Sequence, residues 1–147
     1  MNNKLNKFMR IAIEEAICGK KENGIPIGAV LERGGLIIGK GHNKRVQEND
    51  PILHAEIDCL RNAGRIRDYK DTTLYSTLMP CYLCAGAIIQ FGIKRVVVGD
   101  SVSFHGAKEL LLEHGVELID LNRRECKELM SEFIANNPKL WNEDIGK

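Results

Sequence analysis

The sequence of 147 residues predicts an α/β fold, a three-layer α/β/α sandwich around a five-stranded mixed sheet. Two observations lead to this prediction. Predicted strands and helices follow one another in the order α-β-β-α-β-α-β-α-β-α, and strands separated by helices are expected to be parallel with right-handed crossovers. An initial hairpin adds one antiparallel strand. The length fits a single domain over residues 1–147, because a chain of this size rarely supports two separate cores.

The first half of the chain is expected to form one helix before a β-hairpin and one helix after it. In chain order these elements are a helix over 4–18, strands over 27–32 and 36–41, and a helix from Asp50-Pro51 to about Asn62. Apolar residues at helical spacing mark the first helix, and Gly19 is expected to end it. The turn Arg33-Gly34-Gly35 joins the two strands. Asp-Pro is typical of a helix start, and Gly64 follows the second helix.

The second half alternates between strands and helices. Its elements are a strand over 73–78, a helix from Pro80 to Phe91, a strand over 94–100, a helix over 107–114, a strand over 116–120, a last helix, and a tail after Pro138. Pro80 suits the first helical position, where no N–H is needed, and Gly92 and Gly115 are expected to stop two helices. Asn122 and Glu125 have the spacing of a capping box for the last helix. Because a helix separates the fourth and fifth strands, these strands should be parallel.

The composition limits the classes of function. Hydrophobic residues make up 44% and charged residues 28%, as in ordinary soluble domains. With 21 Lys and Arg against 20 Asp and Glu, the net charge is +1, which argues against a dominant nucleic-acid footprint. No apolar run approaches the length of a membrane span, and the start MNNKLNKFMR lacks the apolar region of a secretory leader. We therefore expect a cytoplasmic protein without a membrane partner.

Five cysteines, an odd number, occur in this chain. In a reducing compartment, cysteines are more often metal ligands or buried thiols than disulfides. Cys18, Cys59 and Cys126 lie among apolar residues of predicted helices, and we expect all three to be buried thiols.

The other two cysteines and a histidine lie at the starts of two predicted helices. Cys81 and Cys84 are three residues apart, which places both sulfurs on one helix face, and a helix N-terminus stabilises thiolates. His54 and Glu56 lie near the start of the preceding helix. The set His54, Cys81 and Cys84 would leave a fourth zinc position open, which is typical of catalytic rather than structural zinc sites.

The two motifs together are more specific than either one alone. A single Cys-x-x-Cys pair also fits a redox pair or half of a zinc ribbon, so a non-enzymatic zinc protein is one alternative. Here H-A-E is followed by P-C-Y-L-C, 24 residues after Glu56, and H-x-E…P-C-x-x-C is the signature of zinc deaminases. In that chemistry, activated water attacks an amino-bearing ring carbon. Glu56, which is not a ligand, would move protons to the ring nitrogen and the leaving amine.

On these residues the chain resembles the cytidine-deaminase-like zinc deaminase superfamily, and along most of its length the yeast-type cytosine deaminases. The segments that carry the resemblance are IAIEEAICGKKENGIPIGAVL, GKGHNKR, LHAEIDCL, KDTTLYSTLMPCYLCAGAIIQFGIKRVVVGD and WNEDIGK. The resemblance implies one Zn²⁺ per chain, conversion of cytosine to uracil and ammonia in pyrimidine salvage, a homodimer, and a C-terminal tail that closes the pocket. Deaminases of guanine or of tRNA adenosine share the helix between the fourth and fifth strands and are the alternatives.

The same resemblance implies the residues that contact the substrate. They are Ile27, Asn43, Ala55, Met79, Phe104, Trp141 and Asp144. The Asn43 amide and the Ala55 N–H would bind the O2 edge of the pyrimidine, Asp144 would accept from its exocyclic amine, and the Met79 carbonyl would face the leaving amine. The remaining three would enclose the ring. The family has Gly and Ser where this chain has Ala55 and Met79. The alternatives outside the resemblance are a turn-forming Asn43 and a solvated Asp144.

Overall fold

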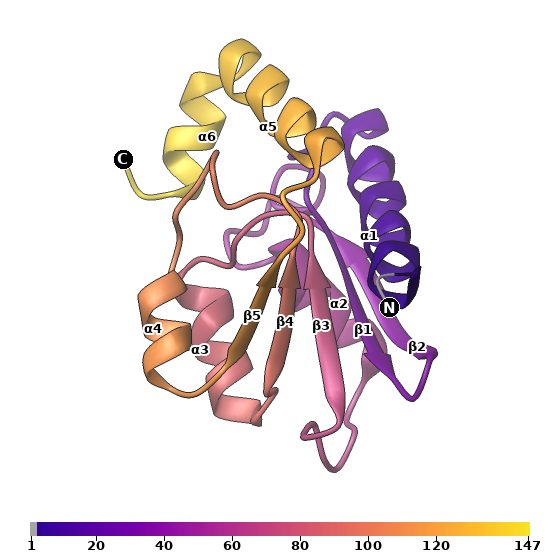
Figure 1. The fold of residues 1–147 in the computed structure, drawn as a ribbon. Coiled ribbons are helices and arrows are strands. Elements are labelled where there is room, and N and C mark those ends of the chain that lie inside the picture. The colour runs from indigo at the N-terminus through magenta and orange to yellow at the C-terminus, as the bar shows by residue number, and fades with distance from the viewer. Residues whose placement is uncertain (1–2) are drawn as a thin grey trace.

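The central sheet of the computed structural model, which describes residues 3–147, has five strands in the order β2-β1-β3-β4-β5 (Figure 1). The strand β1 (Gly28–Arg33) pairs antiparallel with β2 (Leu36–His42) and with β3 (Thr72–Ser76). Both β3 with β4 (Arg95–Val98) and β4 with β5 (Glu117–Asp120) pair in parallel. The predicted five-stranded mixed sheet and its parallel fourth and fifth strands are therefore confirmed.

Six helices surround the sheet in the described part of the chain. They are α1 (Asn3–Lys21), α2 (Ala55–Ala63), α3 (Tyr82–Phe91), α4 (Lys108–Glu113), α5 (Arg124–Asn136) and α6 (Pro138–Asp144). In Figure 1, α1 and α2 lie on opposite faces of the sheet, and α5 and α6 lie across its upper end. No helix among residues 3–147 is long and apolar enough to cross a membrane.

Alternating side chains of the strands form a core on each face of the sheet. Leu74 and Val96 belong to the larger core, which also contains buried residues of α2, α3 and α4. Tyr75 and Val97, their neighbours along the chain, belong to the smaller core, which packs against α1. This two-residue period is the normal geometry of a strand, and it produces the predicted three layers.

The starts of α2 and α3 are later than predicted. Asp50 does not start a helix: its side chain accepts a hydrogen bond from the Ile52 N–H at 2.9 Å, and so it closes a turn. His54 is the N-cap of α2. Likewise, Pro80 precedes the helix instead of occupying its first position, because Cys81 is the N-cap of α3. These shifts place the motif residues at the very beginnings of both helices.

Two other predicted helix boundaries are wrong. The helix α1 continues past Gly19, where a larger residue would crowd the His42 ring at 3.2 Å, so this glycine serves packing rather than termination. The N-cap of α5 is Arg123 instead of Asn122, and Glu125 pairs with the Arg123 guanidinium at 2.8 Å rather than completing a capping box.

The tail and one cysteine also differ from the predictions. Pro138 begins the helix α6, because proline fits the first turn of a helix, and the predicted tail is therefore mostly helical. Cys59 and Cys126 are buried as expected, but Cys18 is exposed on α1, so its assignment as a buried thiol is wrong.

Candidate active site

Three candidate metal ligands meet where α2 and α3 begin. His54 and Cys81 are the two N-cap residues, and Cys84 lies in the first turn of α3. Their ligand atoms all lie within 4.8 Å of one another, and His54 Nδ1 lies 3.5 Å from Cys81 Sγ. The structure thus brings the predicted set together, with one imidazole nitrogen and two sulfurs as donors.

The charges of the two thiols fit a bound dication. The hydrogen bond with Cys84 lowers the pKa of Cys81 to about 4, and the hydrogen bond with His54 contributes to this shift. The Cys81 interaction and burial together raise the pKa of Cys84 well above its usual value. Without a cation, the pair therefore holds one thiolate and one thiol. Because metal coordination ionises a thiol outright, the donor set suits Zn²⁺ with one position left for water.

Glu56 lies beside this group without belonging to it. Its side chain is buried, and Ser76 Oγ lies 3.4 Å from Glu56 Oε2 while its single O–H donates to the nearer Leu78 carbonyl at 2.7 Å. Burial is the main cause that raises the pKa of Glu56 to about 7, and the charge of Cys81 acts in the same direction. A carboxyl group in this environment is suited to accept and return a proton.

A small cavity adjoins the ligand group at the carboxyl ends of β3 and β4, the edge at which open α/β sheets bind ligands. The residues that line it are Ile27, Asn43, His54, Glu56, Leu78, Met79, Cys81, Phe104, Trp141 and Asp144. Six of the seven predicted substrate contacts are among them. The exception is Ala55, which is buried at the first position of α2. The rings of Phe104 and Trp141 meet edge to face, with centroids 5.5 Å apart.

Two buried polar atoms among the residues lining this cavity have no hydrogen-bond partner in the protein. Asn43 is fully buried; its Oδ1 accepts from the Arg45 N–H at 3.0 Å, which leaves Nδ2 unpaired. Asp144 Oδ1 lies 3.2 Å from the Arg45 guanidinium but is not aligned for a hydrogen bond. Burial raises the pKa of Asp144 in spite of the nearby His54 and Arg45. The cavity therefore offers one free donor and one free acceptor.

Arg45 is a site residue that sequence reasoning missed. Its side chain is only 10% exposed, and its Nη1 lies 3.2 Å from Asp144 Oδ1 and 3.3 Å from Glu143 Oε2. Its Nε donates to the Pro51 carbonyl at 2.9 Å. Arg45 thus links α6 to the loop before α2. In the sequence, a charged residue in a polar loop gives no indication of partners almost a hundred positions away. Only the position of Arg45, two residues after Asn43, could have suggested a role in the site. Leu78 was missed as well.

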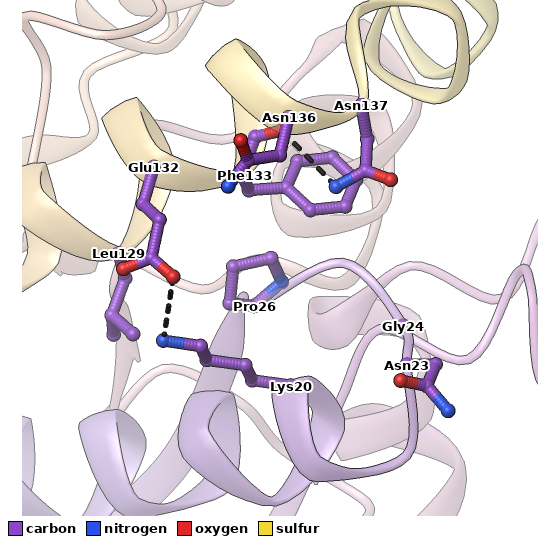
Figure 2. A pocket seen from close by; sticks show the side chains of 9 residues that line it. All are labelled: Lys20, Asn23, Gly24, Pro26, Leu129, Glu132, Phe133, Asn136 and Asn137. Carbon is purple, nitrogen blue, oxygen red and sulfur yellow. Dashed lines mark hydrogen bonds and ion pairs between the residues drawn. The ribbon is translucent and has the colours of Figure 1, made fainter.

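A second hollow lies between α1 and α5 and shares no residue with the first (Figure 2). Lys20 and Glu132 face each other across it at 3.2 Å, and Asn137 donates to the Phe133 carbonyl at 3.3 Å. Within residues 3–147, none of the buried side-chain atoms that lack a partner belongs to this hollow. Its polar groups are already paired or reach solvent, so it lacks the unsatisfied groups of the first cavity.

Comparison with known proteins supports the zinc deaminase chemistry that the sequence motifs predicted. The family model of the cytidine and deoxycytidylate deaminase zinc-binding region matches residues 2–100. The chain belongs to this deaminase family. The matched region contains all three candidate ligands and Glu56, and the deaminase fold agrees with the topology described above.

Relatives of this deaminase differ in their substrates. This chain is 46% identical to cytosine deaminase from Candida albicans over 144 residues, which cover 96% of each chain. It is 38% identical to a tRNA-specific adenosine deaminase from Buchnera aphidicola, covering 92% of this chain and 97% of the relative. A solved structure from work on tRNA:A34 deaminases superimposes with a TM-score of 0.74 and 32% identity, over 84% of this chain and 99% of the other.

Proposed function

We propose that this deaminase converts free cytosine to uracil and ammonia with one zinc ion per chain. The observation that carries the proposal is the pair of unpaired buried atoms, Asn43 Nδ2 and Asp144 Oδ1, in one small cavity beside the candidate ligands. Cytosine offers a carbonyl oxygen to the first and an amino group to the second. The 46% identity with the Candida albicans enzyme, over nearly the whole of both chains, supports this substrate.

The residues of the cavity account for the reaction. Bound zinc acts as a Lewis acid that activates water at neutral pH. Glu56 takes a proton from the attacking water as the water oxygen bonds to C4, and it passes this proton to N3 of the ring. It then transfers the second proton to the amine, the C4–N bond breaks, and uracil and ammonia leave. This shuttle requires a carboxyl group close to the ligands but outside the ligand set, which is where Glu56 lies.

The other residues orient the base and exclude water. Asn43 would donate to O2, with the Ala55 N–H at the start of α2 as a second donor, and Asp144 would accept from the exocyclic amine. The Met79 carbonyl would face the leaving amine. Phe104 and Trp141, in edge-to-face contact, would cover the ring, with Ile27 behind it.

A tRNA adenosine is the main alternative substrate, since a relative of that class is 38% identical. A flipped nucleotide needs an open groove and a basic surface for the phosphates. Here α6 lies beside the cavity, with Trp141 only 6% exposed and Asp144 held by Arg45. The net charge of +1 also gives no basic excess. Both observations favour a free base over RNA. Guanine remains a further alternative, and a non-enzymatic zinc protein would have no use for Glu56.

We also infer a cytoplasmic homodimer that acts in pyrimidine salvage. Tyr82 and Leu83 on α3 and Val102 in the loop after β4 are exposed apolar side chains. Contiguous exposed apolar side chains are typical of contacts between subunits, and Tyr82 and Leu83 are neighbours at the start of α3. Sedimentation of the zinc-loaded protein over a range of concentrations tests the dimer, and a monomer at micromolar concentration would contradict it.

A substrate panel tests the proposed reaction. Protein with a measured zinc content is incubated with cytosine, guanine or unmodified tRNA, and released ammonia is quantified, with Glu56→Gln protein as the blank. We expect ammonia from cytosine alone. Release from tRNA or guanine without release from cytosine would overturn the proposed substrate.

A further inference from the structure

His42, at the end of β2, is enclosed by two carboxylates that belong to α1 and the turn after it. The residue is 7% exposed. Its ring Nδ1 lies 2.8 Å from Glu15 Oε1, and its Nε2 lies 2.9 Å from Glu22 Oε1. These distances are typical of strong hydrogen bonds. The absence of a side chain at Gly19 lets the α1 backbone approach the ring closely.

Both contacts can be hydrogen bonds to carboxylates only if the ring is an imidazolium ion. A neutral imidazole has one N–H, whereas an ionised carboxylate is purely an acceptor. With one proton on the ring, a nitrogen lone pair would therefore face a carboxylate oxygen at less than 3 Å. The doubly protonated ring donates to both.

The alternative, a protonated carboxyl donating to the ring, does not fit the surroundings. Glu22 Oε1 also accepts from Gln47 Nε2 at 3.1 Å, and the hydrogen bonds from His42 and Gln47 lower the pKa of Glu22. The second oxygen of Glu15 has the Lys40 ammonium at 3.9 Å. Both surroundings favour the ionised carboxylate.

The charges around the ring balance when it is protonated. The ionisable groups near it are, on the acidic side, Glu15, Glu22 and Asp58, and, on the basic side, Lys40 and Lys44. Asp58 accepts from the His42 backbone N–H at 3.1 Å and pairs with Lys44 at 3.3 Å. Three negative groups then face two lysines, and the imidazolium supplies the third positive charge. A partly buried cluster with equal charges avoids an unpaired ion.

This cluster is connected directly to Asn43, the next residue. Gln47 donates both to Glu22 and to the Asn43 carbonyl, at 3.1 and 3.2 Å, while the Asn43 N–H donates to the Ile27 carbonyl at 3.0 Å. The His42 ring therefore anchors, through Glu22 and Gln47, the backbone that carries the unpaired Asn43 amide. The ring itself does not line the cavity.

We propose that His42 is a positioning residue: an imidazolium ion that joins α1 to β2 and holds Asn43 in place to bind the base. The inference rests on the proposed function for the role of Asn43. Its consequence is that loss of the two carboxylate contacts weakens substrate binding. The proton-transfer step, in which Glu56 acts, should be affected less.

Nitrogen NMR of zinc-loaded protein labelled with ¹⁵N-histidine tests the protonation directly. The chain has four histidines, and the His42 signals are assigned by their absence from His42→Gln protein, or by their shift in Glu22→Gln protein if the first variant does not fold. We expect both ring nitrogens of His42 to carry a proton at pH 7.5, as its two contacts with carboxylates require. A single protonated nitrogen at that pH would overturn the proposal.

Kinetics test the positioning role. In His42→Gln we expect KM for cytosine to rise by about two- to thirtyfold, the range typical of indirect coupling, with a smaller change in kcat. His114→Gln is the matched control, since His114 is exposed and contacts the Leu110 carbonyl. An unchanged KM, or equal changes in KM in the two variants, would refute the role.

The two proposals fail in different ways. If the wild-type protein releases no ammonia from cytosine, the proposed substrate is wrong; the NMR result still decides the protonation, and KM is measured with the base that the panel identifies. If cytosine is a substrate but the His42→Gln KM is unchanged, the positioning role alone is wrong.

Discussion

The cavity beside the ligand group and the hollow between α1 and α5 contain similar residue types. Each has a carboxylate, a basic group nearby, an asparagine and an aromatic ring. They differ in how the polar groups are satisfied. In the hollow, Lys20 and Glu132 pair at 3.2 Å while both remain about half exposed. In the cavity, Asn43 Nδ2 and Asp144 Oδ1 are buried and take part in no hydrogen bond within the protein, although Arg45 Nη1 lies 3.2 Å from Asp144 Oδ1.

This difference favours the cavity over the hollow as a binding site. A buried polar group without a hydrogen-bond partner destabilises a fold by about 1–3 kcal/mol. A ligand that forms hydrogen bonds with two such groups in one cavity can offset this destabilisation. Paired or solvated groups give a ligand nothing that water does not already supply. The predictions below test this contrast between the two sites, beginning with the largest expected effect.

Replacing one carboxylate in each site should separate them most clearly. Glu56→Gln keeps the size of the side chain but removes its ability to shuttle protons, so turnover of cytosine should fall by about 10²–10⁴ with zinc content unchanged. Glu132→Gln, in the hollow, should change turnover less than twofold. Ammonia release and metal analysis of both variants check this. A Glu56→Gln enzyme of normal activity would remove Glu56 from the mechanism.

Loss of the metal should affect the cavity and leave the hollow intact. Chelation, or the change Cys84→Ser, should abolish most activity and lower the melting temperature, since a ligand present at a hundred times its Kd stabilises the native state by about 2.7 kcal/mol. Adding Zn²⁺ should restore the chelated wild type but not the variant. As a control, Cys18→Ser changes an exposed thiol outside the site. Full activity of the metal-free protein would contradict the zinc assignment.

Much of the candidate ligand set and of the topology could be predicted from the sequence, because local spacing encodes them. The candidate ligands His54, Cys81 and Cys84 belong to short motifs at helix starts, and helix periodicity alone places the two sulfurs on one face. The parallel pairing of the last two strands followed from the helix between them. These features depend on neighbours in the chain.

What the sequence could not predict depends on distant partners. Arg45 contacts α6 at a separation of 98 positions in the chain, and nothing local indicates this. Gly19 lies within α1, where the absence of a side chain makes room for the His42 ring. The rule that glycine ends a helix cannot anticipate this packing. Asn122 and Glu125 have the spacing of a capping box, yet Arg123 competes for the glutamate and the cap does not form.

The unpaired acceptor itself gives the third test. Asp144→Asn removes the charge but keeps the shape, and kcat/KM for cytosine should fall by about ten- to a hundredfold, as expected for losing a hydrogen bond to a charged group. Folding stability should be unchanged or slightly higher, because a buried carboxylate without a full partner is removed. Glu143→Gln is the control, because Glu143 directly precedes Asp144 and its side chain is 66% exposed. A parallel loss of stability and activity would indicate a structural role instead.

The smallest effect should come from the paired groups of the hollow. Lys20→Ala breaks an ion pair that is about half exposed on both sides, and such pairs contribute about 0–1 kcal/mol, less at high salt. The urea midpoint should therefore shift only slightly at low ionic strength and not at all in 1 M NaCl, with kcat/KM unchanged. Because Pro26 of the hollow directly precedes Ile27 of the cavity, a drop in kcat/KM without a change in stability would mean that the two sites communicate through this loop, and the contrast between them would no longer hold.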